Sequence, residues 1–211
     1  MKDTTIVSLT YNTSTMQTFE NRQQMLSTLV PQAAIIIELG VFMGEFANFI
    51  NQNLKPSKLH LVDTWSGDIC SGDQNGNNVV YVNGGYAYEH VKLLFANEPN
   101  VNIVRDYSYN FMSSLPDKSV DMIYIDADHS YEGVKKDLDI AIKKVKDGGW
   151  IMGHDYYINM QKCMNMYDFG VGRAVDEFVK EHNLKIDALA MDGCVSFAIR
   201  KGTSPPSGSF P

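Results

Sequence analysis

The chain has 211 residues, of which 44% are hydrophobic and 20% are charged, and its formal net charge is -7. This length and composition are typical of one globular α/β domain with a full hydrophobic core. The negative charge argues against nucleic acid as a partner, because phosphate binding needs a basic surface. Three cysteines without a CxxC pair indicate neither a disulfide framework nor a structural zinc site, and they favour a reducing, cytoplasmic location.

The two ends of the chain carry little structural signal. The first residues lack the pattern of a signal peptide, and no apolar run is long enough to span a bilayer, so no membrane association is expected. We expect a single domain over residues 1–201. Residues 202–211 are rich in Pro, Gly and Ser and are predicted to form a disordered tail. The sequence allows a homo-oligomer but does not fix the oligomeric state.

Short apolar runs alternate with helix-period segments along the chain. Strands are predicted at 34–38, 59–63, 101–104, 121–126, 150–153, 186–191 and 195–200. Helices are predicted at 45–54, about 86–97, about 134–145 (ended by Gly148-Gly149) and about 171–182. The segment 66–85 is rich in Gly, Asn and Asp and is interpreted as a long lid or binding loop.

This alternation predicts an α/β fold with a mainly parallel, seven-stranded sheet and helices on both faces. Asp192-Gly193 separates the last two predicted strands and is a hairpin signal. The final strand is therefore expected to run antiparallel to its neighbours.

Acidic residues stand at or just beyond the ends of five predicted strands: Glu38, Asp63, Asp106, Asp126 and Asp155. In open α/β sheets, ligands bind outside the carboxyl ends of the strands. Burying several carboxylates without partners costs free energy, so packing alone does not explain them. These positions are therefore the candidates for a functional site.

The loop Glu38-Leu-Gly-Val-Phe-Met-Gly44 follows the first of these strands. Gly40 and Gly44 allow a tight turn and a close approach to a ligand. The dinucleotide fingerprint would need two further glycines, where Phe42 and Glu45 stand. The loop therefore favours a nucleoside ligand without a pyrophosphate, although a plain strand-to-helix turn is an equal alternative.

The next two strand ends suggest how such a nucleoside is held. Asp63 lies about 20 residues past the glycine loop and can accept both hydrogens of a ribose diol; alternatively, it caps a helix. Asp106 or Ser108 can meet the adenine edge, or Ser108 can cap the helix that follows.

The last two strand ends bring further polar groups together. Asp126, Asp128 and His129 lie within four residues of one another, and Asp155 ends the adjacent strand. Oxygen ligands at that point suit Mg²⁺ or a similar cation, with His154 either a further ligand or a packed imidazole. Asp128 and His129 are candidate general bases.

Three motifs together resemble the class I methyltransferases, which have a Rossmann-like fold and use S-adenosylmethionine: ELGVFMG, LVDTW, and IDADHSYEGVKKDLDIAIKKVKDGGWIMGHDY. The last stretch is similar to that of metal-dependent sugar O-methyltransferases of the macrocin and mycinamicin type. The resemblance implies that Asp126 and Asp155 hold the metal and that Asp128 or His129 is the base. The chain departs from these enzymes at His154, where a second acid is common, and from catechol-type enzymes at Tyr156, where they carry Asn.

The resemblance implies methyl transfer to a sugar hydroxyl, for example on a deoxyhexose such as rhamnose within a glycan. Trp65, Tyr81 and Tyr86, in or beside the 66–85 segment, are expected to stack on the sugar. The alternatives are a catechol-type O-methyltransferase for small aromatic acceptors, an NAD-dependent nucleotide-sugar oxidoreductase, and a non-catalytic module that binds an adenosine ligand or a metal.

Overall fold

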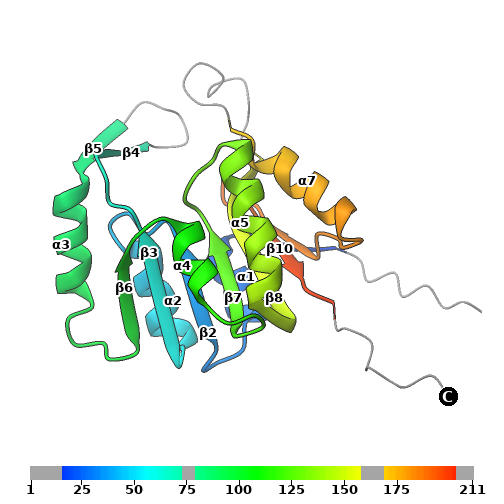
Figure 1. Cartoon of the computed structure of the whole chain (residues 1–211), viewed down its shortest axis with the longest axis horizontal. Helices are drawn as coiled ribbons and strands as arrows, with labels where there is room; N and C mark the ends of the chain where they lie inside the picture. Colours follow the sequence, from blue (N-terminus) through cyan, green and yellow to red (C-terminus); the bar gives the residue numbers. More distant parts are fainter. Residues whose placement is uncertain (1–15, 73–78, 158–168, 203–211) are drawn as a thin grey trace, which may run out of the picture.

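The computed structural model describes residues 16–72, 79–157 and 169–202. Within these residues an eight-stranded main sheet has the order β1-β9-β10-β8-β7-β2-β3-β6 (Figure 1). Its strands are β1 (Gln17–Phe19), β2 (Ile35–Leu39), β3 (Lys58–Asp63), β6 (Val101–Arg105), β7 (Val120–Ile125), β8 (Val145–Tyr157), β9 (Ala188–Ala190) and β10 (Val195–Arg200). All neighbours pair in parallel, except that β10 runs antiparallel to β8 and β9. The mainly parallel sheet with an antiparallel last strand is confirmed, and β1 is an additional edge strand.

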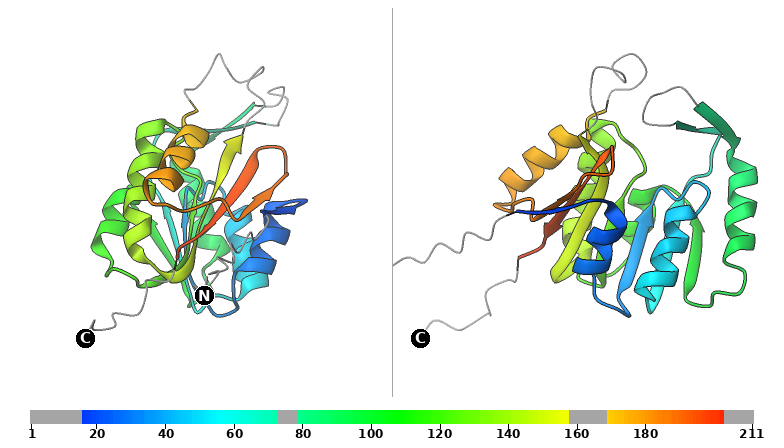
Figure 2. Two further views of the ribbon diagram at one scale, coloured as in Figure 1. Left: turned by 90° about the vertical axis from the view of Figure 1, so that its right-hand side faces the viewer. Right: turned by 180° about the vertical axis from the view of Figure 1, so that it is seen from behind.

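Helices cover both faces of this sheet, as expected. They are α1 (Arg22–Leu29), α2 (Glu45–Leu54), α3 (Gly84–Leu94), α4 (Ser108–Ser114), α5 (Tyr131–Lys144) and α7 (Val171–Glu181). Figure 2 shows α1 and α2 on one side of the sheet and α4, α5 and α7 on the other. None of the helices in the described part of the chain is long and apolar enough to cross a membrane.

Two hydrophobic cores follow from the alternation of side chains along each central strand. Ile36 and Met122 point into the core under α1 and α2, whereas Ile37 and Ile123 point into the core under α5 and α7. Because both faces are covered, these strands read as continuous apolar runs in the sequence.

The segment between β3 and α3 contains a hairpin where a long loop was expected. β4 (Asp68–Gly72) pairs antiparallel with β5 (Val79–Asn83) in a separate two-stranded sheet. Asn83 then caps α3 by accepting hydrogen bonds from the backbone N–H groups of Gly85 and Tyr86. Residues 73–78 of this segment and residues 203–211 of the predicted tail lie outside the described residues.

The end of α5 also differs from the prediction. The helix ends at Lys144, and Val145 is already extended, so Gly148-Gly149 does not terminate it. Both glycines lie within β8, beside a register irregularity between β8 and β7. A Cβ at Gly149 would come within 2.7 Å of the backbone oxygen of Asp121, so the glycine serves this close approach.

Candidate functional site

The parallel strands bring the acidic strand ends to one edge of the sheet. Glu38 lies in β2, Asp63 ends β3, Asp126 follows β7, and His154 and Asp155 lie near the end of β8. β2 is paired with both β3 and β7, and β7 with β8. The predicted residues of the glycine loop and of the metal site therefore belong to neighbouring strands.

The glycine loop owes its shape to contacts within the protein. Gly40 has φ +85° and Gly44 has φ +81°, which are left-handed values that favour glycine. A Cβ on Gly40 would lie 1.9 Å from the backbone oxygen of Asp126. Gly40 is thus required so that the chain leaving β2 can pass the end of β7. Gly44 is the N-cap residue of α2.

Asp63 holds this loop in place. Its Oδ2 accepts hydrogen bonds from the backbone N–H groups of Val41 (2.8 Å) and Phe42 (3.0 Å), and its Oδ1 accepts one from Trp65 (2.8 Å). The next element after Asp63 is β4, so the alternative that Asp63 caps a helix is wrong. A carboxylate has about four lone-pair sites, and three are used by these bonds, so about one site remains on Oδ1 for a hydroxyl group of a diol. Its role in binding a ribose stays a prediction.

Glu38 is a buried carboxyl group beside this loop. Its side chain is 2% exposed, and its Oε2 has no hydrogen-bond partner. Burial raises the pKa of Glu38 well above its ordinary value; the charge of Asp126 adds to this shift, and the charge of Arg22 opposes it. Burial thus favours the neutral form of Glu38, whose Oε2 is buried without a hydrogen-bond partner.

Asp106 and Ser108, the predicted adenine contacts, are engaged locally. Asp106 Oδ1 accepts hydrogen bonds from the backbone N–H of Tyr107 and from the side chain of Asn110. Ser108 Oγ donates to Asp137 Oδ1 over 2.7 Å. Tyr107, not Ser108, is the N-cap of α4, so the capping interpretation of Ser108 is wrong.

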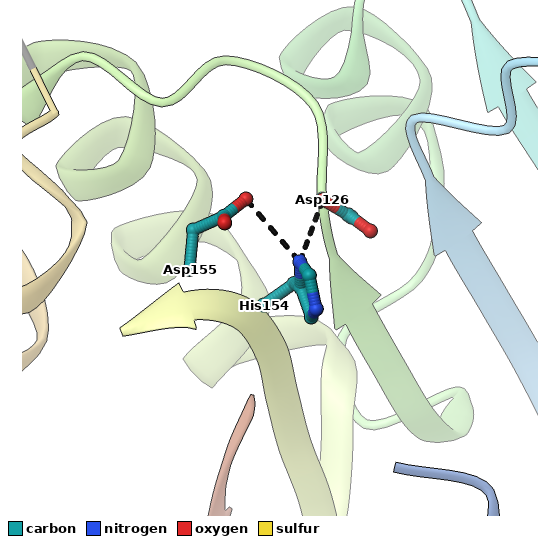
Figure 3. A group of neighbouring side chains, drawn as sticks. All are labelled: Asp126, His154 and Asp155. Atoms are coloured by element: carbon teal, nitrogen blue, oxygen red, sulfur yellow. Dashed lines mark ion pairs between the residues drawn. The ribbon is translucent and has the colours of Figure 1, made fainter. Parts of the chain in front are cut away.

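Asp126, His154 and Asp155 form a compact group at the ends of β7 and β8 (Figure 3). Each offers one ligand atom, and these atoms lie within 4.8 Å of one another. His154 Nδ1 is 3.3 Å from Asp155 Oδ2 and 3.8 Å from Asp126 Oδ1. Asp155 has φ +58°, a strained value for a residue with a Cβ, and such strain is concentrated at functional sites.

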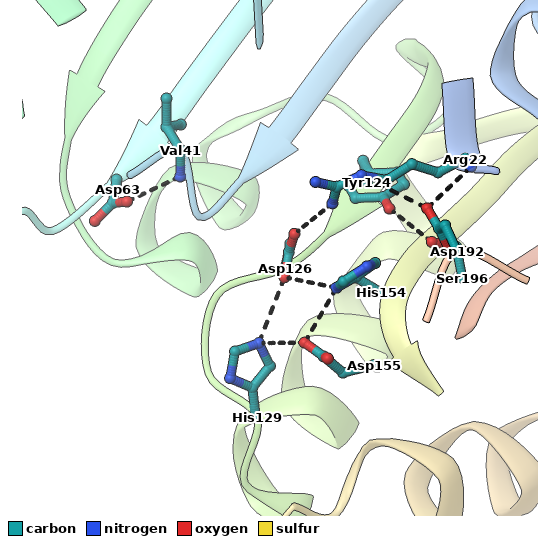
Figure 4. Close-up of polar contacts among 10 residues, drawn as sticks. All are labelled: Arg22, Val41, Asp63, Tyr124, Asp126, His129, His154, Asp155, Asp192 and Ser196. Atoms are coloured by element: carbon teal, nitrogen blue, oxygen red, sulfur yellow. Dashed lines mark hydrogen bonds and ion pairs between the residues drawn. The ribbon is translucent and has the colours of Figure 1, made fainter. Parts of the chain in front are cut away.

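His129 completes the cluster (Figure 4). Its Nε2 lies 3.0 Å from Asp155 Oδ2 and 3.4 Å from Asp126 Oδ1. The ring stacks on Phe169, with 5.1 Å between centroids, and the backbone oxygen of His129 accepts a hydrogen bond from Gly170. Phe169 and Gly170, just before α7, thus hold this imidazole in place.

The charges of the cluster compensate one another. Burial lowers the pKa of His129, but hydrogen bonds to Asp126 and Asp155 outweigh it and raise the pKa to about 10. Burial alone would raise the pKa of Asp155, but hydrogen bonds from His129 and His154 hold it well below its usual range. In this arrangement the carboxylate of Asp155 is ionised and His129 is protonated.

Asp128, the other candidate base, is directed elsewhere. Its Oδ1 accepts a hydrogen bond from the backbone N–H of Ser130, and its carboxyl group lies against Gly133 in the first turns of α5. A Cβ on Gly133 would come within 2.3 Å of that group. The structure therefore brings His129, but not Asp128, into contact with Asp126 and Asp155.

Two features of the site were missed or misread in the sequence. Arg22, in the first turn of α1, places its Nη1 3.2 Å from Asp126 Oδ2. Trp65, expected to stack on a sugar, is fully buried and donates from Nε1 to the backbone oxygen of Phe42. Trp65 supports the glycine loop, and the expectation of a sugar contact is wrong for this residue.

Comparison with known proteins identifies the family. The model of the methyltransferase domain family matches residues 37–156, more than half of the chain, from β2 to the end of the cluster. The chain belongs to this family. The expected class, a class I S-adenosylmethionine-dependent methyltransferase domain, is confirmed at this level. The match includes the glycine loop, Asp63, His129 and the Asp126, His154 and Asp155 group.

A related sequence is an uncharacterized protein of Acanthamoeba polyphaga mimivirus, 27% identical over 146 residues. The match covers 65% of this chain and 58% of that protein, so the chain spans little more than half of the relative's length.

Among solved structures, a Corynebacterium glutamicum protein superposes with a TM-score of 0.64 at 16% identity, over 87% of this chain and 82% of that one. The N-methyltransferase NodS of Bradyrhizobium japonicum, in complex with S-adenosyl-L-homocysteine, gives 0.60 at 13% identity, over 85% and 83% of the chains. An O-methyltransferase family protein of Burkholderia thailandensis gives 0.59 at 9% identity, over 87% and 56%. These identities support a shared fold and no more.

Proposed function

We propose that this domain transfers the methyl group of S-adenosylmethionine to a sugar hydroxyl, with a divalent cation, Mg²⁺, at Asp126 and Asp155. The observation that carries the proposal is the convergence of Asp126, His154 and Asp155 beside the glycine loop. The match to the methyltransferase domain family supports S-adenosylmethionine as the methyl donor.

The donor set fits a divalent cation. Two carboxylates supply the hard oxygen ligands that Mg²⁺ and Mn²⁺ prefer, and His154 offers an imidazole nitrogen as a third ligand. A cation bound there would stabilise the negative charge that develops on the acceptor oxygen and would position that oxygen. A sugar hydroxyl is a very weak acid, so it needs this help more than an amine or a phenol does.

On this proposal the protein's own groups divide the remaining work. Glu38, Gly40, Gly44 and Asp63 line the cofactor site, with Asp106 and Ser108 toward the adenine. His129 is the first candidate to take the proton of the acceptor, because it lies beside both proposed metal-binding carboxylates and so next to the expected position of the acceptor oxygen. While both carboxylates pair with it, His129 holds a proton, so it becomes a base only when they are engaged elsewhere. Asp128 is the second candidate base and would have to leave its contacts at α5.

The β4–β5 hairpin is the proposed acceptor platform. Tyr81, in the middle of β5, is 66% exposed, and Tyr86, near the start of α3, is 64% exposed. Exposed tyrosines can stack on a sugar ring and hydrogen-bond to its hydroxyl groups. A deoxyhexose within a glycan is the proposed acceptor.

Methyl transfer from S-adenosylmethionine to a panel of glycans, phenols and amines tests the proposal. We expect a glycan to be the best acceptor, a chelator to abolish turnover and Mg²⁺ to restore it. Asp126→Asn should abolish turnover, whereas Asp139→Asn, which alters a carboxylate 46% exposed on α5, should have little effect. Faster transfer to catechols would favour the catechol-type alternative. If an amine is the best acceptor and its methylation is as fast with a chelator as without one, both the divalent cation and the oxygen acceptor of the proposal are wrong.

A further inference from the structure

Arg22 reaches the cluster from the N-terminal helix. It is the first residue of α1, and its backbone N–H donates to Asp192 Oδ2 over 3.0 Å, which anchors the helix to the turn between β9 and β10. This anchor belongs to the backbone, so it does not depend on where the guanidinium lies.

The guanidinium itself has several partners, among them the side chain of Tyr124, to which it is hydrogen-bonded. Its Nη1 donates to Asp126 Oδ2 over 3.2 Å, its Nε lies 3.9 Å from Asp192 Oδ2, and the group lies 4.2 Å above the ring of Phe46 (Figure 4). The side chain is 24% exposed. Arginine remains charged in proteins, so Arg22 contributes a permanent positive charge at this position.

Asp126 is consequently shared between two kinds of partner. Its Oδ2 faces Arg22, and its Oδ1 faces His129 and His154 at 3.4 and 3.8 Å. Glu38, which lies in the same field, has its pKa raised by burial and by Asp126 and lowered by Arg22. Arg22 therefore carries a permanent positive charge in a region that also contains the acidic side chains of Glu38, Asp126 and Asp192.

We propose that Arg22 is the internal counter-ion of Asp126 and competes with the divalent cation for this carboxylate, so that Arg22 sets the cation affinity of the site. The inference rests on the metal site of the proposed function. A guanidinium within hydrogen-bond distance of one carboxylate oxygen repels a divalent cation bound to the other oxygen, and the partly buried position weakens solvent screening. Because Arg22 faces Oδ2 and the histidines face Oδ1, Arg22 acts on the cation through its charge on the shared carboxylate, while the backbone bond to Asp192 keeps α1 in place.

Binding of Mn²⁺ to the full chain, measured by electron paramagnetic resonance and calorimetry, tests this competition. Arg22→Gln should bind Mn²⁺ about tenfold or more tightly than the unaltered protein, because the repelling charge is gone. Arg22→Lys keeps the charge and should stay close to the unaltered protein. Arg173→Gln removes a charge from an arginine that is 69% exposed on α7, and should change the affinity less than about twofold.

Circular dichroism and thermal melting establish that each variant is folded before its affinity is compared. Equal or weaker Mn²⁺ binding by folded Arg22→Gln, with normal binding by the unaltered protein, would overturn the role of Arg22 and leave the metal site standing. Absence of Mn²⁺ binding in every form would instead refute the metal site and, with it, the competition. Weaker binding of S-adenosylhomocysteine by Arg22→Gln, with Mn²⁺ affinity unchanged, would assign Arg22 to the cofactor and also overturn the proposal.

Discussion

At the carboxyl ends of the central strands, each acidic side chain has different neighbours, and these neighbours decide its charge. Glu38 is buried without a hydrogen-bond partner to its Oε2, and its pKa is raised, first by burial. Asp155 is also nearly buried, but two imidazoles donate to it, and its pKa is lowered. Carboxyl groups of the same chemical class thus have their pKa values shifted in opposite directions by their surroundings.

Asp137 lies away from the cluster and gives a test of this electrostatic reasoning. Its side chain is 1% exposed, and burial raises the pKa of Asp137 from 3.8 to about 6, although the hydrogen bond from Ser108 opposes the shift. Between these pH values the folded protein binds the proton more tightly than the unfolded chain does. The free energy of unfolding should therefore fall as the pH rises from about 4 to about 6.

Asp137→Asn removes this titration and keeps an acceptor for Ser108. We expect the variant to be more stable than the unaltered protein by about 1–3 kcal/mol at pH 7, and the difference to vanish below about pH 4. Urea unfolding of both proteins from pH 3.5 to 7.5 measures it. A difference that is independent of pH would mean that Asp137 titrates normally.

The sequence predicted which residues lie together when their places are set by the order of the strands. It did not predict contacts that depend on one particular neighbouring side chain or loop. Asp126, His154 and Asp155 were brought together as expected, because the ends of adjacent parallel strands meet at one edge. The bonds of Asp63 to the glycine loop and the burial of Trp65 depend on the local path of two loops. No spacing rule encodes that path.

Among the secondary-structure elements, the junction between β2 and the end of β7 is the most constrained. A Cβ at Gly40 would lie 1.9 Å from the backbone oxygen of Asp126, whereas a Cβ at Gly67 would meet nothing within 4 Å. Both glycines have positive φ, +85° and +70°. The pair therefore separates the cost of backbone strain from the cost of a steric clash.

Gly40→Ala should lower the free energy of unfolding by about 3 kcal/mol or more, because strain and overpacking add. Gly67→Ala should lower it by about 1–2 kcal/mol, from strain alone. Chemical denaturation of the two variants gives the comparison. Equal losses would indicate that the chain near Asp126 moves easily to admit a methyl group.

Helices and strands with a clear hydrophobic pattern were predicted close to their observed bounds, and those without one were missed. α2 and β10 have the predicted bounds, Glu45–Leu54 and Val195–Arg200, because each carries a clear period and a clear end. β1 has only three residues and is defined by pairing with β9, so no local pattern marks it. α1 was missed with it, and so was Arg22, since nothing near Arg22 in the sequence points to Asp126.

For the whole molecule, the order of the strands explains why the candidate site is assembled from distant segments. β2 and β7 are neighbours in the sheet, so the glycine loop after residue 39 meets the chain after residue 125. Asp126 N–H donates to the backbone oxygen of Leu39 over 2.8 Å, which joins the two ends directly. The glycine loop and the proposed metal group are therefore joined by a backbone hydrogen bond, and a ligand of the loop should stabilise the entire domain.

Thermal melting with ligands tests this expectation and separates the enzyme classes considered for the chain. A ligand present at about 100 times its dissociation constant adds about 2.7 kcal/mol to the stability of the folded state, which raises the Tm of a domain of this size by about 5–10 °C. S-adenosylhomocysteine should produce this shift with or without a chelator, because the loop residues and not the metal group hold it. NAD should produce none, and Asp63→Asn should reduce the shift, while Asp139→Asn should preserve it. A comparable shift with NAD would reinstate the oxidoreductase, and a full shift in Asp63→Asn would remove Asp63 from the cofactor site.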